Sequence, residues 1–167
     1  MKKLLILAVA LLVLFAVAPV MAPAMKTTVT GEFSGIATDP GVTWTSEEGI
    51  IQIRDGAGAG SVTGDLPGIM TFTMNAAFDP TTGTGRAWGT FVTTDPSGNT
   101  FEGTWLMSIS YWGNYIEGKS VAHGTGAYDG MILKNPFWGY NAYFGVPPYP
   151  DPPIYFEFDG TIISPQG

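Results

Sequence analysis

The sequence predicts an all-β protein, a single closed or nearly closed antiparallel β-barrel of about eight strands after an N-terminal signal peptide helix. Short runs rich in Val, Ile, Thr and aromatic residues alternate with Gly, Pro and Asp throughout residues 25–167. No segment there has apolar residues at helical spacing. Two similar glycine-rich stretches, residues 83–89 and 124–131, indicate corners where a sheet bends until it closes.

The first 24 residues have the pattern of a secretory signal peptide. Lys2 and Lys3 precede an apolar run over residues 4–21, and small residues at 22–24 give a cleavage pattern. We expect cleavage after Ala24, and export to the periplasm, cell surface or medium without a stable membrane anchor. The alternative is an uncleaved anchor, since the apolar run is nearly long enough to span a bilayer. The rest of the chain, residues 25–167, is predicted to be one barrel domain.

Net charge and the content of cysteine and histidine indicate which kinds of partner and cofactor are not expected. The mature chain keeps five basic residues against all 14 acidic ones, a net charge of −9, so a nucleic-acid partner is not expected. The chain has no cysteine, which excludes disulfides and thiolate sites and suits an exported prokaryotic protein that relies on packing. With His123 as the single histidine, we expect no metal site and no cofactor.

Turn residues divide the mature chain into strands. Asp-Pro pairs at 39–40, 79–80 and 95–96, each soon followed by glycine, have the residues that type I turns prefer. In the first half we expect strands at 27–38, 42–46 with 49–54, 61–66 and 69–78, and a flexible glycine-rich loop at 55–60. In the second half we expect strands at 84–94, 100–111, 115–123, 128–134 and 154–164.

Alternation along two of these strands predicts which side chains face the barrel interior. Residues two apart share one face of a strand, so runs of apolar residues at this spacing indicate a buried face. These buried sets are Met70, Phe72, Met74, Ala76 and Phe78 on one strand, and Phe101, Trp105, Met107, Ile109 and Tyr111 on the other. In the glycine corner at 124–131, Tyr128 is expected to be a buried plug.

A proline-rich and aromatic segment at residues 135–153 is predicted to be a long loop. It is either a binding lip at the barrel mouth or a stiff strap that plugs the barrel end. If a ligand binds, we expect aromatic residues of the lumen and of this segment to contact it: Trp105, Tyr111, Trp138, Tyr140 and Tyr143.

Three charged residues within predicted strands are the weak candidates for catalysis. Arg54, Glu102 and Glu117 are ordinary surface charges if they face outward. If one of them faces the lumen, burial would shift its pKa and make it a site residue. The sequence contains no recognisable catalytic constellation, so no catalytic residue is assigned.

The sequence resembles the allene oxide cyclase-like and dirigent-like β-barrels, with the look of secreted bacterial members. A Gly-Thr-Gly element with a following aromatic and an apolar strand lies at 124–133. A Thr-Gly-x-Phe-x-Gly strand lies at 30–35, and a Gly-Thr-Ile strand at 160–162. The resemblance implies a small antiparallel barrel, in a group that includes an oxylipin cyclase and stereoselectivity-directing proteins. No catalytic residue of the family matches a position here. Lipocalin-like and avidin-like barrels are neighbouring possibilities.

Three functions follow from this reading. The preferred one is a secreted, non-enzymatic barrel that binds a small apolar or aromatic ligand, or a surface partner, at its mouth. The second is a cofactor-independent cyclase or isomerase that acts on an apolar substrate in the lumen. The third is a purely structural envelope or extracellular protein. Self-association into a homo-oligomer is compatible with each of them.

Overall fold

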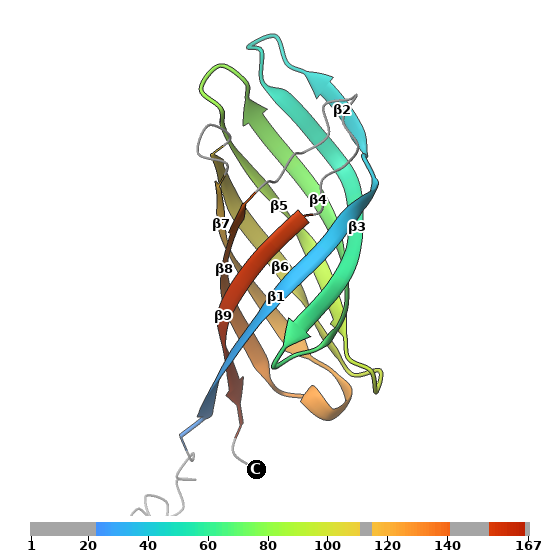
Figure 1. The fold of residues 1–167 in the computed structure, drawn as a ribbon, viewed down its shortest axis with the longest axis vertical. Coiled ribbons are helices and arrows are strands. Elements are labelled where there is room, and N and C mark those ends of the chain that lie inside the picture. Colours follow the sequence, from blue (N-terminus) through green and yellow to red (C-terminus); the bar gives the residue numbers. More distant parts are fainter. Residues whose placement is uncertain (1–22, 111–114, 141–153, 166–167) are drawn as a thin grey trace, which may run out of the picture.

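The structure is a computed structural model that describes residues 23–110, 115–140 and 154–165. Nearly all of this chain is in strands, with one short 3₁₀ turn (Figure 1). The elements in chain order are β1 (Met25–Asp39), β2 (Val42–Thr45), β3 (Ile51–Gly64), β4 (Gly68–Asp79), β5 (Thr84–Thr94), β6 (Thr100–Ser110), β7 (Tyr115–Gly124), η1 (Gly126–Tyr128), β8 (Ile132–Tyr140) and β9 (Ile154–Ser164).

The sheet closes on itself, which confirms the predicted fold class. From β3 to β9 each strand pairs antiparallel with the next, and β1 pairs with both β9 and β3. Eight strands therefore form a closed barrel, and β2 is an additional strand that pairs only with β3. We call the end that carries both described chain ends and the η1 turn the terminal end. The opposite end, with β2 and the β4–β5 turn, is the distal end (Figure 1).

The predicted alternation of faces is confirmed on the described strands. Phe72 and Phe78 are half-buried inside, and Met70, Met74 and Ala76 are buried beside them. The buried interior also receives side chains from each of the other barrel strands: Val29, Phe33, Ile53, Val62, Ala87, Phe91, Phe101, Met107, Ile109, Ile116, Ala122, Leu133, Phe137, Phe158 and Ile162. Polar side chains dominate the outer face, as expected for a barrel with a solvated exterior.

The seam between β1 and β3 depends on small residues. Gly35 of β1 lies opposite Gly60 of β3, and the ring of Phe33 packs against both. A Cβ atom on Gly60 would overlap the backbone of Ser34 and Gly35 and would lie 2.7 Å from Phe33 Cζ. Glycine therefore lets the first strand and the third approach closely enough to complete the barrel.

The stretch at 124–131 closes the terminal end. The Tyr128 ring stacks on Phe101 with centroids 4.7 Å apart, and its hydroxyl donates to Asp95 Oδ2 at 2.9 Å. Gly126 has φ +64°, and its Cα lies so close to the Asn99 amide that a Cβ would overlap Asn99 Oδ1. Tyr128 packs on the core as predicted, but it is half-buried rather than buried. The turn is a 3₁₀ turn, and β8 begins at Ile132 rather than at Tyr128.

The Asp95 carboxylate accepts hydrogen bonds from the residues that pack at the terminal end, so its ionisation should affect the stability of the fold. The Asn99 side chain, through its hydrogen bond to the carboxylate, lowers the pKa of Asp95 below its usual value; the Asn99 backbone, Tyr128 and Ser97 add to this. A carboxyl with a lowered folded-state pKa stabilises the protein above its unfolded pKa, and this contribution is lost as pH falls through the folded pKa. We expect the melting temperature of the wild type to exceed that of Asp95→Asn at pH 7, with the gap narrowing below about pH 4. A constant gap from pH 7 to pH 3 would contradict this role.

Several strand predictions were wrong in detail. Residues 55–60 are part of β3 rather than a flexible loop, because their glycines pair with β1 and β4. A bulge at Asp55, which has φ +57°, separates this part of β3 from its first residues. Residues 135–140 belong to β8 rather than to the predicted long loop, and the rest of that predicted segment, residues 141–153, lies outside the described residues. The stretch 83–89 is not a second corner: only Gly83 is in a turn, and the rest lies in β5.

Most of the predicted signal peptide, residues 1–22, lies outside the described residues. Within the part that is described, no helix has the length and apolar content needed to cross a membrane.

Candidate functional site

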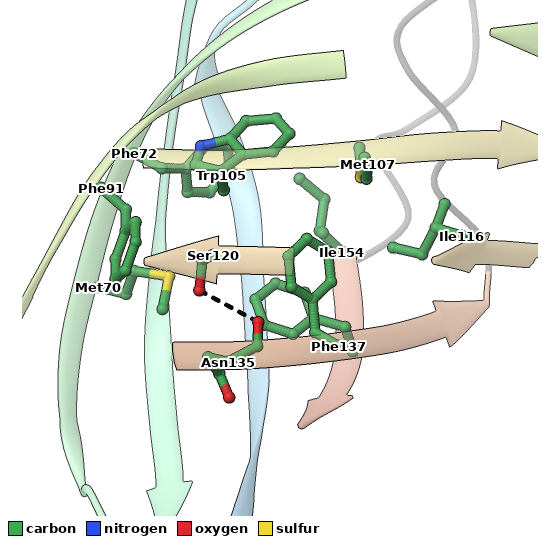
Figure 2. A pocket seen from close by; sticks show the side chains of 11 residues that line it. Met70, Phe72, Phe91, Trp105, Met107, Ile116, Ser120, Asn135, Phe137 and Ile154 are labelled. Atoms are coloured by element: carbon green, nitrogen blue, oxygen red, sulfur yellow. Dashed lines mark hydrogen bonds between the residues drawn. The ribbon is translucent and has the colours of Figure 1, made fainter. Parts of the chain in front are cut away.

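A half-enclosed chamber of about 50 Å³ lies inside the barrel (Figure 2). Six strands, β4 to β9, supply its walls, so the chamber depends on closure of the whole sheet. Most of the wall is aromatic or aliphatic: Met70, Phe72, Phe91, Trp105, Met107, Ile116, Phe137, Ile154 and Phe156. Since a cavity needs about 15 Å³ per water, this one holds roughly three water volumes. The lumen is therefore largely filled by side chains but is not solid.

Aromatic contacts fix the shape of the chamber wall. Phe72 and Trp105 pack edge to face with their ring centroids 6.3 Å apart, and the ring centroids of Phe137 and Phe156 are 5.0 Å apart. Behind them Phe33, fully buried, stacks on Phe156 at 4.7 Å and meets Phe72 edge to face at 6.0 Å. Such ring pairs prefer these geometries, so the walls are held by packing beyond their area of contact. Met70 and Met107 are the adaptable parts of the wall, because unbranched thioethers change shape easily.

One polar pair interrupts the apolar wall. Ser120 and Asn135 lie directly opposite each other on β7 and β8, and each is only 6% exposed. The Ser120 hydroxyl donates to the backbone oxygen of Asn135 at 3.4 Å (Figure 2). The Asn135 side-chain oxygen is buried without a hydrogen-bond partner among the described residues. Sequence reasoning missed both residues: Asn135 precedes Pro136 at the start of the predicted loop, and no local pattern marks Ser120.

The three weak catalytic candidates are not in the chamber. Glu102 and Glu117 are exposed on the outer face of β6 and β7. Arg54 also lies outside, where its guanidinium sits between two indoles, 5.3 Å from the Trp44 ring centroid and 5.2 Å from that of Trp88. It donates further hydrogen bonds to the carbonyls of Ile53 and Ala76 and to the Gln52 side chain. Through its contacts with Trp44 of β2 and Trp88 of β5, the Arg54 side chain attaches β2 to the outer face of the barrel.

The predicted ligand contacts are divided between two sides of the wall. Trp105 lines the chamber, and its indole N–H donates to the Thr90 carbonyl at 3.3 Å. Trp138 is half-buried on the outer face of β8, opposite Glu117 and Glu157. Tyr140 ends β8 at the distal end. Tyr111 and Tyr143 lie outside the described residues. Of the two predicted contacts whose side chains the structure describes, Trp105 lines the chamber and Trp138 does not.

A second recess lies on the outer face near the distal end. This open groove, of about 650 Å³, is bordered by Asp79, Arg86, Trp88, Tyr115 and Glu117. Hydrogen bonds from the backbone of Thr81 and from Thr82 lower the pKa of Asp79. These bonds make one oxygen of this carboxylate, Oδ1, part of the β4–β5 turn.

No titratable group lines the chamber within the described part of the chain. Desolvation and the nearby Glu32 and Glu157 raise the pKa of Tyr155, but that side chain is on the outer face. Desolvation and Asp95 raise the pKa of Tyr128 at the terminal end. His123 is exposed at the end of β7, and no cluster of three or more His, Asp or Glu side chains that could hold a metal occurs among the described residues. The chamber can therefore bind by shape, apolar contact and one polar pair.

No protein-family model, no curated protein and no solved structure matches this chain.

Proposed function

We propose that the protein binds a small, largely apolar molecule inside its barrel and has no catalytic activity of its own. The observation that supports this is the half-enclosed chamber, whose wall is aromatic and aliphatic apart from Ser120 and Asn135. Burial of apolar ligand surface contributes about 25 cal/mol per Å². The aromatic part of the wall is already packed without a ligand, which avoids part of the ordering cost of binding. Export through the signal peptide at residues 1–24, as the sequence predicts, would put this binding protein outside the cytoplasm.

The cyclase or isomerase alternative has less support. Such chemistry requires a charged or strongly polar group aimed at the reacting centre in a water-excluded site. Arg54, Glu102 and Glu117, the candidates for that group, lie on the outer face. The resemblance to allene oxide cyclase-like barrels thus supports a shared barrel architecture in this proposal, without a shared reaction.

Filling the chamber should abolish binding without opening the barrel. In Met107→Trp an indole replaces a wall thioether inside the barrel. Its matched control is Leu106→Trp, the neighbouring residue of β6, whose side chain is 43% exposed on the outer face. We expect toluene, titrated into the mature protein and followed by methionine-methyl NMR, to shift the Met70 and Met107 signals of the wild type. It should also shift the Met70 signal of Leu106→Trp but leave that of Met107→Trp unchanged.

Circular dichroism and melting temperature show whether both variants remain folded, since overpacking costs about 1–3 kcal/mol. Mass spectrometry of small molecules extracted from the purified wild type gives the natural occupant. Absence of toluene-induced shifts in the folded wild type, together with absence of a co-purified molecule, would refute the proposed function.

A further inference from the structure

Ser120 and Asn135 are buried polar residues in a chamber wall that is otherwise apolar. Within one row across the barrel interior, Trp105 of β6 lies opposite Ser120 of β7, which in turn lies opposite Asn135 of β8. Aliphatic residues at both positions would fill the wall without any polar group to satisfy. A buried amide oxygen without a hydrogen-bond partner, like that of Asn135, costs about 1–3 kcal/mol, so its presence needs a compensating interaction.

The surroundings of Asn135 leave room for its side-chain amide but provide no hydrogen-bond donor for the amide oxygen. Its side-chain oxygen lies over Gly160 of β9, where a Cβ atom would be only 2.6 Å away. The β8–β9 ladder is interrupted here: pairs run from Lys134 with Thr161 to Phe137 with Phe158, without a pair between them. Pro136 has no N–H to contribute to this stretch. The oxygen therefore rests against a glycine Cα and receives no donor from the described chain.

The pair retains unused hydrogen-bonding capacity. Ser120 uses its one proton on the Asn135 backbone oxygen, so the lone pairs of its hydroxyl oxygen can still accept. An asparagine amide has an acceptor at one end and donors at the other. Because the two ends have nearly the same shape, rotation of the amide exchanges the positions of its acceptor and its donors. Together the two side chains can both accept from and donate to a single group.

We propose that the bound molecule carries one hydroxyl group, as a phenol or an alcohol does, and that Ser120 and Asn135 recognise this hydroxyl. This inference rests on the proposed function and identifies the class of ligand. A hydroxyl is both donor and acceptor, which matches the pair, whereas the remaining wall accepts only apolar surface. A carboxylate or an ammonium group is excluded, because no charged partner lines the chamber among the described residues. A ligand as large as one aromatic ring enters by displacement of Met70 and Met107.

Phenol and toluene are the probes that test this inference. They have the same size and shape and differ in one hydroxyl against one methyl group. Each is titrated into the folded mature wild type, Asn135→Leu, Ser120→Ala and the outer-face control Thr104→Val. In the wild type and in Thr104→Val we expect phenol to bind at least as tightly as toluene. In Asn135→Leu we expect phenol affinity to fall about tenfold relative to toluene, with a smaller change in the same direction in Ser120→Ala.

The outcomes separate this inference from the proposed function. If toluene binds the wild type but the phenol-to-toluene ratio is the same in all four proteins, the chamber binds apolar molecules and the hydroxyl recognition is wrong. If neither probe binds the folded wild type and no small molecule co-purifies with it, the proposed function fails. If Asn135→Leu does not fold, Ser120→Ala decides, since it removes one small hydroxyl and keeps the amide.

Discussion

Gly60→Ala is expected to lose about 3 kcal/mol of unfolding free energy, the upper end of what overpacking costs. The added Cβ would overlap the backbone of Ser34 and Gly35 and would press on the Phe33 ring at 2.7 Å. Backbone cannot move aside as a flexible side chain can, so the β1–β3 seam must separate. Urea unfolding of the mature protein at neutral pH measures the loss.

Gly56→Ala is the matched control for this seam. Gly56 is also in β3, is buried, and has no positive φ, but a Cβ there would meet its nearest neighbour, Met74 Cε, at an ordinary 3.4 Å. We expect Gly56→Ala to change stability by less than about 0.5 kcal/mol, because alanine is no worse than glycine in a strand that has room for it. Equal losses in the two variants would mean that close approach at the seam does not hold the barrel together.

Phe33→Ala is expected to destabilise the protein by about 3–5 kcal/mol. Phe33 has no exposed surface, and its ring joins Phe72 of β4 to Phe156 of β9 from behind the chamber. Removal of the ring deletes buried apolar surface and leaves a void beside the chamber that rigid strands cannot close. Denaturant unfolding tests this, with Phe33→Leu as the comparison that keeps most of the side-chain volume.

The void left in Phe33→Ala should also affect ligand binding, which gives a second test that is independent of stability. If Phe33→Ala remains folded at low temperature, the chamber should be larger and toluene should bind at least as tightly as in the wild type. A loss below about 1 kcal/mol in Phe33→Ala would show that the ring is not central to the core.

The fold could be predicted because alternation is a local property of each strand. The period-two run from Met70 to Phe78 identified an inward face without knowledge of its neighbours, and the Asp-Pro turns separated successive strands. The glycine run at 55–60 misled the prediction because glycine in isolation favours loops. Here its small size is what lets β3 approach β1 and β4.

The candidate site could not be predicted in the same way. Ser120 and Asn135 are fifteen positions apart and face each other only because of the register between β7 and β8. Arg54 looked like a possible lumen charge, yet the bulge at Asp55 and the two indoles on the outer face explain its position. Such facts depend on cross-strand pairing, which local sequence patterns do not determine.

A crystal of the mature protein under xenon pressure tests most directly whether the closed barrel holds an apolar chamber. Apolar cavities in proteins remain dry and take up xenon. We predict a xenon atom inside the barrel, bounded by Phe72, Trp105 and Phe137, with β1 paired to β3. A lumen that is filled by side chains and takes up no xenon, or a sheet that is open between β1 and β3, would contradict this structure and the function proposed from it.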